Sequence, residues 1–138
     1  MAEPNEFNAA IITEFRANGG KVGGQFAGAP LLLLTTTGAK SGRQITTPLM
    51  YAHDGERMIV FASKAGAPEN PAWFHNLLAH PVVKLEVGDE TFEANAAPVS
   101  GSERDRLYNE QAARFPGFAD YQAKTSRKIP VVALERAR

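Results

Sequence analysis

A short loop between two strand-like stretches is the segment best suited to bind an anion. Residues 38–43 read GAKSGR. Glycine lets the backbone approach a ligand closely, and the guanidinium of Arg43 can pair with phosphate oxygens, with Lys40 and Ser41 beside it. The loop is not a Walker phosphate loop, because Ala39 rather than glycine precedes Lys40 and the chain continues into a strand. The alternative is a solvated turn whose charges bind nothing.

A second loop of the same kind begins at Ser63 and Lys64 and continues as AGAPENP. If both loops border one sheet, Lys64 converges with Lys40 and Arg43 on one rim. The alternative is that Lys64 is an ordinary surface lysine that binds no ligand. The expectation of a shared cationic rim therefore depends on the fold.

Two groups of aromatic side chains could contact a flat ligand. Trp73 is the only tryptophan and stands near Asn76, where an indole could cover a heteroaromatic ring; the alternative is an ordinary core residue. Phe115, Phe118 and Tyr121 follow one another at spacings of three. Their alternative role is to pack a helix onto the sheet, although the Tyr121 hydroxyl could also donate a proton to a substrate.

Composition argues against several other kinds of chemistry. The chain has no cysteine, which removes thiol redox centres, zinc fingers and disulfide frameworks. His75 and His80 are five residues apart and would point to different sides of a helix, and His53 stands apart from them, so no metal site is expected. Fifteen basic and fifteen acidic side chains give zero net charge, which argues against a nucleic-acid partner. No Ser-His-Asp order or paired carboxylates favour a hydrolase.

The elements that must position these residues begin with an N-terminal helix within residues 1–20, which apolar residues at helical spacing predict. Asp54-Gly55 between two strand-like runs is the strongest hairpin signal in the chain. Ser100 with Glu103 three residues later has the form of a capping box and predicts the start of a helix.

Residues 1–138 are expected to form one domain with 43% hydrophobic and 22% charged residues, as in ordinary globular proteins. Strands are expected at 31–37, 44–53, 57–63, 82–88, 91–99 and 129–135, and helices at 72–79, at 102–115 and within 118–125. Six short strands with hairpin connections favour an α+β fold: a mostly antiparallel sheet or small barrel with short flanking helices.

No segment predicts membrane insertion or export. The longest apolar run, Leu31–Leu34, is far too short to cross a bilayer, and the first residues, MAEPNEF, lack the basic and apolar parts of a signal peptide. A cytoplasmic location is therefore expected.

Several motifs recur in one order: TTTGAKSGR, ASKAGA, PAWFHNL and a C-terminal stretch that contains FADYQAKT. From Gly19 onward, the chain that carries them resembles the deazaflavin-dependent (coenzyme F420) nitroreductase and quinone reductase family. The resemblance implies a split β-barrel, often dimeric in related folds. It also implies a reduced deazaflavin that donates hydride to an electron-poor acceptor such as a quinone, an activated enone or a nitroaromatic.

The resemblance further implies roles for single residues. The phosphate and glutamyl tail of the cofactor would lie on the basic loop, at Lys40, Ser41, Gly42 and Arg43. Its ring system would lie near Pro48, Met50, Ser63, Lys64, Trp73 and Asn76. Ser63 and Tyr121 are expected to act at the reacting groups.

The nitroreductases of that family carry tyrosines where this chain has Phe115 and Phe118, and Met50 stands where a tyrosine can occur. Quinones or activated enones are therefore expected at least as much as nitroaromatics.

Two other functions stay open at this point. The chain could use FMN, since split barrels also serve flavins, or it could bind a cofactor without catalysis. The expected partners are a small-molecule electron acceptor and a second copy of the chain. No nucleic acid or metal is expected, and contact with a membrane surface is left open.

Overall fold

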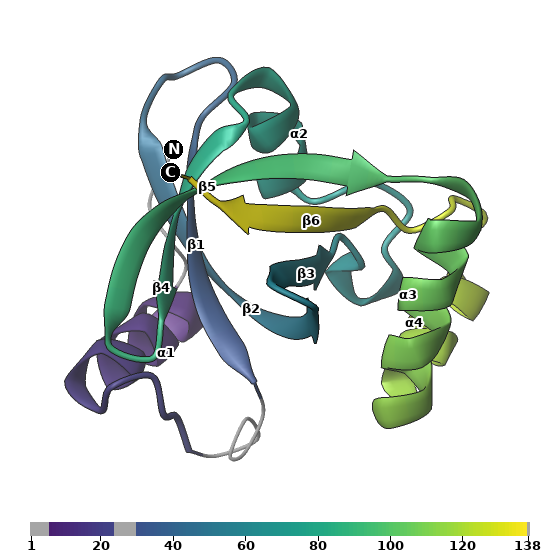
Figure 1. Cartoon of the computed structure of the whole chain (residues 1–138), viewed down its shortest axis with the longest axis horizontal. Helices are drawn as coiled ribbons and strands as arrows, with labels where there is room; N and C mark the ends of the chain where they lie inside the picture. The colour runs from purple at the N-terminus through teal and green to yellow at the C-terminus, as the bar shows by residue number, and fades with distance from the viewer. Residues whose placement is uncertain (1–5, 24–29, 138) are drawn as a thin grey trace.

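The computed structural model describes residues 6–23 and 30–137, in which six antiparallel strands close into a barrel (Figure 1). Around the barrel the strands follow the order β1-β2-β3-β6-β5-β4. The strands are β1 Leu31–Thr37, β2 Gln44–Asp54, β3 Arg57–Phe61, β4 Val82–Val87, β5 Glu90–Val99 and β6 Val131–Arg136. The helices are α1 Glu6–Ala17, the 3-10 turn η2 Lys64–Gly66, α2 Ala72–Ala79, α3 Gly101–Arg114 and α4 Gly117–Lys124. This confirms the expected barrel with short flanking helices; residues 1–5 of the expected N-terminal helix lie outside the described residues.

Strand β1 is buried on both faces, as its unbroken run of leucines predicts. Leu32 and Leu34 join a cluster of apolar residues inside the barrel. Leu31 and Leu33 point outward and pack against the apolar side of α1, formed by Ile11, Ile12 and Phe15. The apolar spacing of α1 therefore serves one purpose, which is to cover the outer face of this strand.

Helix α1 is also tied to the neighbouring β4. The guanidinium of Arg16 donates to both carboxylate oxygens of Glu86, at 2.9 and 2.8 Å. Just beyond the helix, Gly20 passes so close to Gly88 that a Cβ at position 20 would lie 2.7 Å from the Gly88 Cα. Glycine is required at this crossing because the two backbones touch.

Helix α2 lies across one end of the barrel, near the top of Figure 1. Its side chains Trp73, Phe74 and Leu77 enter the interior cluster and are 6%, 8% and 1% exposed. Burying three such residues contributes about 1.5–3 kcal/mol each to folding. The helix therefore closes this end of the barrel with its apolar side chains.

Strand β2 changes partner along its length. Residues 44–50 pair with β1, and residues 51–54 pair with β3. Pro48 lies where β2 pairs with β1 alone, so its missing N–H faces the open side of the strand. From residue 45 to residue 52 every side chain is half-buried, whichever face it points to.

Helices α3 and α4 pack on the outer face of β3 and β6 and form a lobe to the right in Figure 1. Leu107, Tyr108 and Phe118 cover Ile59, Phe61, Val131 and Ala133. The two helices and α1 thus stand on opposite sides of β2, which runs between them (Figure 1). No helix in the described part of the chain is long and apolar enough to cross a membrane.

Three local expectations are wrong. Ser100 precedes α3 but makes no side-chain cap, and the Glu103 carboxylate, the other half of the expected capping box, instead accepts a hydrogen bond from Arg57 at 2.7 Å. Strand β3 ends at Phe61 rather than at residue 63, because Ser63 has helical backbone angles. Strand β6 begins at Val131 rather than at residue 129, and it extends to Arg136.

Candidate functional site

The basic loop of residues 38–43 closes on itself. The Gly38 N–H donates to the Arg43 carbonyl at 2.7 Å, the Gly42 N–H donates to the Gly38 carbonyl at 3.0 Å, and the Arg43 N–H donates to Ser41 Oγ at 3.1 Å. Gly42 has a φ of +71°, which a residue with a side chain adopts rarely. Residues 39–43 are all exposed, but the Ser41 hydroxyl turns back onto the loop, so Lys40 and Arg43 are the side chains that it presents to solvent.

Asn76 of α2 holds this loop in place from behind. Its Oδ1 accepts the Ala39 N–H at 3.0 Å, and its Nδ2 donates to Thr36 Oγ1 at 3.2 Å. The Asn76 side chain is buried, with 7% of the residue exposed. Both ends of the amide are therefore engaged by protein, so the structure gives Asn76 a supporting position rather than an open face toward a ligand.

Trp73 does not line an open space. It is 6% exposed and lies in the interior cluster, with its ring centroid 6.5 Å from that of Phe74. The expectation that Trp73 covers a flat ligand is wrong in this structure, because the closed barrel needs large side chains from α2 to fill its end. The ordinary core role, the alternative considered from the sequence, holds for this residue.

The outer face of β2 is the half-exposed surface between α1 and the lobe. We call it the β2 face and define it by Thr46, Pro48, Met50 and Ala52. Met50 contacts both the α1 cluster and the cluster under α3 and α4, so it lies at the junction between them. Two of the predicted residues, Pro48 and Met50, thus share an apolar strip whose edge is open toward the end of β3.

Ser63 and Lys64 lie at the end of β3, on the open side of β2. Strand β3 pairs with β2 from Asp54 back to Tyr51 and ends at Phe61, so Ser63 and Lys64 follow the end of β3 that lies nearest Tyr51. Lys64 has a φ of +47°, unusual for a residue with a side chain, and its Nζ lies 2.9 Å from a Glu69 oxygen. The predicted sharing of one cationic rim is therefore incomplete, since Glu69 already neutralises Lys64.

Lys40 and Arg43 differ from Lys64 in this respect. Within residues 6–23 and 30–137, neither side chain has an acidic partner within ion-pair distance. Two exposed cations on a glycine-bearing loop suit the phosphate and carboxylate groups of the deazaflavin that the resemblance implies. The half-exposed apolar strip of the β2 face suits its flat ring, so the residues present fit this cofactor.

The aromatic run on α4 divides into a core residue and a surface residue. Phe118 is 7% exposed and packs edge-on against Phe61, Tyr108 and Tyr121, with centroid distances of 5.5, 6.3 and 5.3 Å. Phe118 is therefore packing rather than an open pocket wall. Tyr121 is half-exposed, and its hydroxyl has no hydrogen-bond partner in the described part of the chain. Tyr121 packs against the same apolar cluster as Met50 and Ala52 of the β2 face.

Tyr108 is the buried phenol of the same cluster. Burial raises its pKa, while the charges of Arg104 and Arg127 act in the opposite direction. The hydroxyl donates to the Phe118 carbonyl at 2.6 Å and is committed to holding α3 on α4. Of the two tyrosines, Tyr121 is therefore the one available to a substrate.

Arg127, which the sequence did not single out, contacts the predicted site from behind. Its guanidinium donates to the carbonyls of Ala62, Ser63 and Ala67 and to Asn70 Oδ1. Only a polar stretch, KTSRK, precedes β6, and an arginine in such a stretch is normally solvated. No sequence signal distinguishes it from a surface residue.

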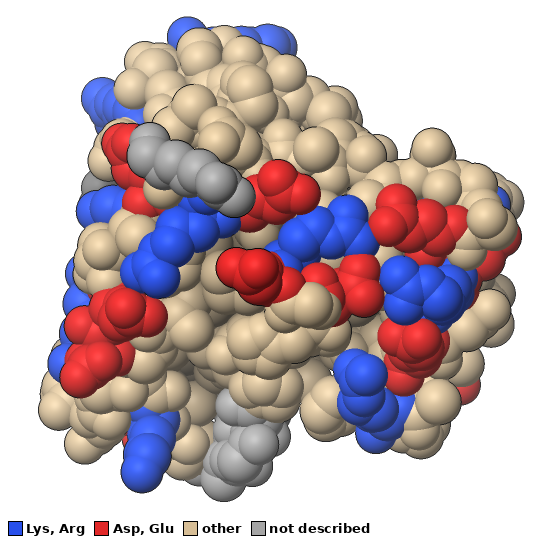
Figure 2. Space-filling model, viewed as in Figure 1, with Lys and Arg blue, Asp and Glu red and all other residues tan. Residues whose placement is uncertain are grey.

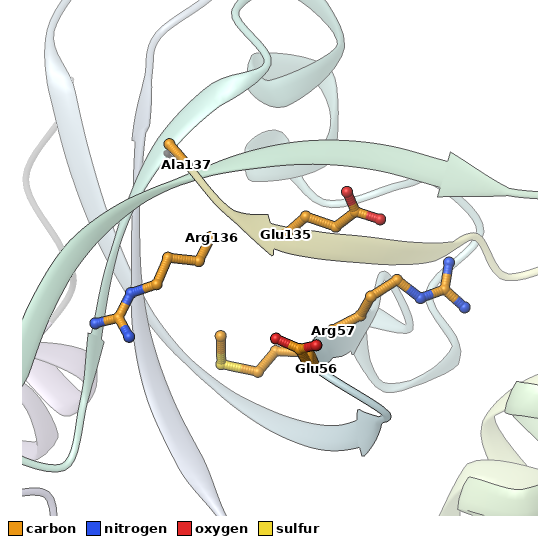
Figure 3. A pocket seen from close by; sticks show the side chains of 6 residues that line it. Glu56, Arg57, Glu135, Arg136 and Ala137 are labelled. Atoms are coloured by element: carbon orange, nitrogen blue, oxygen red, sulfur yellow. The ribbon is translucent and has the colours of Figure 1, made fainter.

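A hollow of about 520 Å³ lies away from these residues, lined by Glu56, Arg57, Met58, Glu135, Arg136 and Ala137. Figure 3 shows the guanidinium groups of Arg57 and Arg136 pointing to opposite sides. Arg57 pairs with Asp54 and Glu103, while Arg136 pairs with Glu90. Because its two guanidinium groups diverge and are already paired, this hollow lacks the convergent polar groups of a binding site. Within the described residues, no group of three or more His, Asp or Glu side chains could hold a metal.

Comparison with known proteins shows the family and the fold of the chain. The sequence model of the F420H(2)-dependent quinone reductase family matches residues 10–136. The chain is 43% identical to an F420H(2)-dependent quinone reductase of Mycobacterium tuberculosis, over 88% of this chain and 85% of that protein. A solved F420-H2 dependent reductase, FDR-A, superposes with a TM-score of 0.70 at 38% identity, covering 77% of this chain and 94% of its own. A second solved structure, described as a domain-swapped dimer, superposes with a TM-score of 0.72 at 35% identity, covering 92% of this chain and 93% of its own.

Proposed function

The chain belongs to the F420H(2)-dependent quinone reductase family and is an F420-dependent reductase, and from this premise we propose that its acceptor is a quinone reduced on the β2 face. The observation that carries the proposal is the arrangement around β2. Lys40 and Arg43, which have no acidic partner among the described residues, lie on the loop before the strand, and Met50 lies between α1 and the lobe that bears Tyr121. When bound, the reduced deazaflavin supplies the hydride.

The protein's own part is binding, orientation and charge. We assign Lys40, Ser41, Gly42 and Arg43 to the anionic phosphate and glutamyl groups, because two of these side chains carry unneutralised charge and Gly42 admits close approach. Pro48 and Met50 give the ring an apolar surface, and Ser63 and Lys64 border it at the end of β3. Asn76 holds the loop through the Ala39 N–H, and Trp73 anchors α2, the helix that carries Asn76, in the interior cluster.

A quinone that receives hydride gains negative charge on oxygen and must then take up a proton. The half-exposed hydroxyl of Tyr121 can donate a hydrogen bond to that oxygen and pass it a proton. Ser63 is the second hydroxyl at this side of the strand and is half-exposed as well. With Phe118 buried and Phe115 apolar, these two hydroxyls are the groups that we assign to the reacting end of the acceptor.

We also propose that the chain forms a dimer, since a relative of 35% identity is described as a domain-swapped dimer. Mass measurement in solution tests this directly. A monomer at micromolar concentration would exclude it.

Titration of the purified chain with F420, FMN and NADPH tests the cofactor and the acceptor in sequence. We expect saturable binding of F420 and oxidation of F420H2 by quinones such as a soluble menaquinone analogue. If enones or nitroaromatics were turned over faster than quinones, the proposed quinone acceptor would be wrong and the faster class would take its place. Preferential binding of FMN would overturn the assignment of the β2 face to a deazaflavin, and binding of F420 without turnover on any acceptor would identify a cofactor-binding protein.

A further inference from the structure

Arg127 lies in the connection between α4 and β6, and its guanidinium makes four hydrogen bonds to a segment about sixty residues earlier. Nε donates to the Ala67 carbonyl at 2.9 Å, and one terminal nitrogen donates to the Ala62 carbonyl at 3.0 Å and to Asn70 Oδ1 at 2.7 Å. The other terminal nitrogen donates to the Ser63 carbonyl at 2.7 Å. The side chain therefore holds both ends of the turn that contains Ser63 and Lys64.

Arg127 is bound by neutral oxygens rather than by a carboxylate. All four acceptors are neutral oxygens, and no carboxylate lies within ion-pair distance of Arg127 in the described residues. A half-buried guanidinium loses hydration, and it is normally retained only where its planar fork is fully used. Lysine, with one nitrogen on a flexible stem, could not reach these four oxygens at once.

The backbone of Arg127 is held as firmly as its side chain. Its carbonyl accepts Gln122 Nε2 at 2.7 Å, and Gln122 Oε1 in turn accepts Arg104 and the Ile129 N–H at 2.7 and 3.1 Å. The clamp is thus built on α3, α4 and the start of β6. It is not a loose surface contact.

Clamping the carbonyls determines where the matching amides point. In a trans peptide the C=O and the following N–H point in opposite directions, and no described peptide bond is cis. Because the Ala62 and Ser63 carbonyls face Arg127, the N–H groups of Ser63 and Lys64 face away from it. In the part of the chain that the structure describes, neither N–H has a hydrogen-bond acceptor.

The turn is also packed against α4. A Cβ at Gly66 would lie 2.8 Å from the Tyr121 carbonyl, so the turn and the helix that carries Tyr121 touch at backbone level. Gly66 has a φ of +82°, and Lys64 has a φ of +47°. Glycine adopts such an angle freely, but Lys64 does not, so the clamp holds Lys64 in a conformation that a residue with a side chain disfavours.

We infer that Arg127 is a positioning residue for the redox site: it fixes the orientation of Ser63 and Lys64 relative to Tyr121, and so fixes the surface on which the cofactor is bound. The inference rests on the proposed function, which places the cofactor against Ser63 and Lys64. Arg127 itself lies behind the turn and acts through it.

The test compares Arg127→Met with Lys128→Met, which removes a cation from the next, exposed position. Arg127→Met should lower F420 affinity roughly ten- to a hundredfold in an equilibrium titration, and Arg127→Lys should restore little of it, since the fork rather than the charge is required. Lys128→Met should bind like the wild type. Amide hydrogen exchange should accelerate at residues 63–67 in Arg127→Met alone.

Asn70→Ala removes one acceptor of the clamp and is the second variant to test if Arg127→Met does not fold. It should lower F420 affinity and accelerate exchange at residues 63–67, each by less than Arg127→Met. If exchange accelerates at residues 63–67 while F420 affinity stays at the wild-type value, the role of Arg127 is only structural and the inference is wrong. Full rescue by Arg127→Lys would equally overturn it. Wild-type protein that does not bind F420 would instead refute the proposed function, while the exchange data would still show whether the clamp orders the turn.

Discussion

The loop of residues 38–43 closes on its own backbone, and its cations have no acidic partner in the part of the chain that the structure describes. The segment of residues 62–70, by contrast, is closed by Arg127 and has its one lysine paired with Glu69. The first can therefore offer charge to a ligand. The second offers a defined shape. A cofactor with an anionic tail and a flat reactive ring needs both, because charge gives affinity at a distance and shape determines how the reacting atoms meet.

The loop of residues 38–43 is attached to α2 through Asn76. Asn76→Ala should therefore have the largest effect of the substitutions considered. The substitution leaves the buried Thr36 hydroxyl without its donor and the Ala39 N–H without its acceptor, and it empties space beside Leu77. We expect a loss of about 2–4 kcal/mol in the free energy of unfolding, measured by urea denaturation. His75→Ala on the exposed side of the same helix is the control, and an equal loss in both variants would contradict the special role of Asn76.

The free charges of the first loop should matter more for affinity than the neutralised charge of the second. Arg43→Ala should cost about 1.5–3 kcal/mol in F420 binding, or roughly ten- to hundredfold. The loss should shrink as salt is added, because exposed charges are screened. Lys64→Met should cost clearly less, since Glu69 already holds its Nζ at 2.9 Å. The comparison fails if Lys64→Met weakens binding as much as Arg43→Ala does at low salt.

The lobe beside the second segment should contribute to turnover rather than to cofactor affinity. Tyr121→Phe removes a half-exposed hydroxyl and keeps the ring that packs on Phe118 at 5.3 Å. Turnover with quinones should fall by up to about 10²-fold if the hydroxyl supplies the proton, while F420 affinity stays near the wild-type value. Stability should change little. Equal turnover in both proteins across several quinones would reduce Tyr121 to a packing residue.

Local signals were sufficient for the strands and helices, but they left a sheet or a small barrel open, and the barrel came from the family resemblance. The Asp54-Gly55 turn, the run of four leucines and the alternating strands each point to one arrangement. The same reasoning identified the basic loop, whose conformation is set by hydrogen bonds among neighbours within six residues.

Contacts between distant residues were out of reach of that reasoning. Trp73 stands beside a polar loop in sequence but fills the barrel end in space, because only the closed sheet creates the volume that it occupies. Arg127 reaches acceptors about sixty residues away. Glu103 pairs with Arg57 across 46 positions and so leaves the expected capping box unmade. In each case the side chain's partner is supplied by the fold and cannot be read from spacing.

The lobe that carries Tyr121 is joined to the barrel by exposed charges as well as by its apolar side. Figure 2 shows alternating acidic and basic side chains where the lobe meets the barrel. The centre of this group is Asp54, which accepts hydrogen bonds from Arg57 and from Arg106. The hydrogen bond from Arg57, followed by that from Arg106, lowers the pKa of Asp54 below its ordinary value of 3.8.

Because the folded protein lowers this pKa, the ionised carboxylate stabilises the fold above the unfolded value of 3.8, and the contribution disappears as pH falls through the lower pKa of the folded state. Asp54→Asn should therefore reduce Tm slightly at pH 7, and the difference from wild type should shrink as pH falls below 3.8. Salt at 1 M should narrow the difference at pH 7 because solvent reaches these groups. Asp89→Asn, at an exposed position without an ion pair in the described residues, is the matched control and should follow the wild type throughout. A gap between Asp54→Asn and wild type that is the same at pH 3 and pH 7 would show that the side chain's shape rather than its charge joins the lobe to the barrel. The lobe would then be held, without the charge of Asp54, by the apolar contacts of Phe118 and its neighbours and by the hydrogen bonds from Arg104 to the Ile129 carbonyl, and the position of Tyr121 would not depend on this titration.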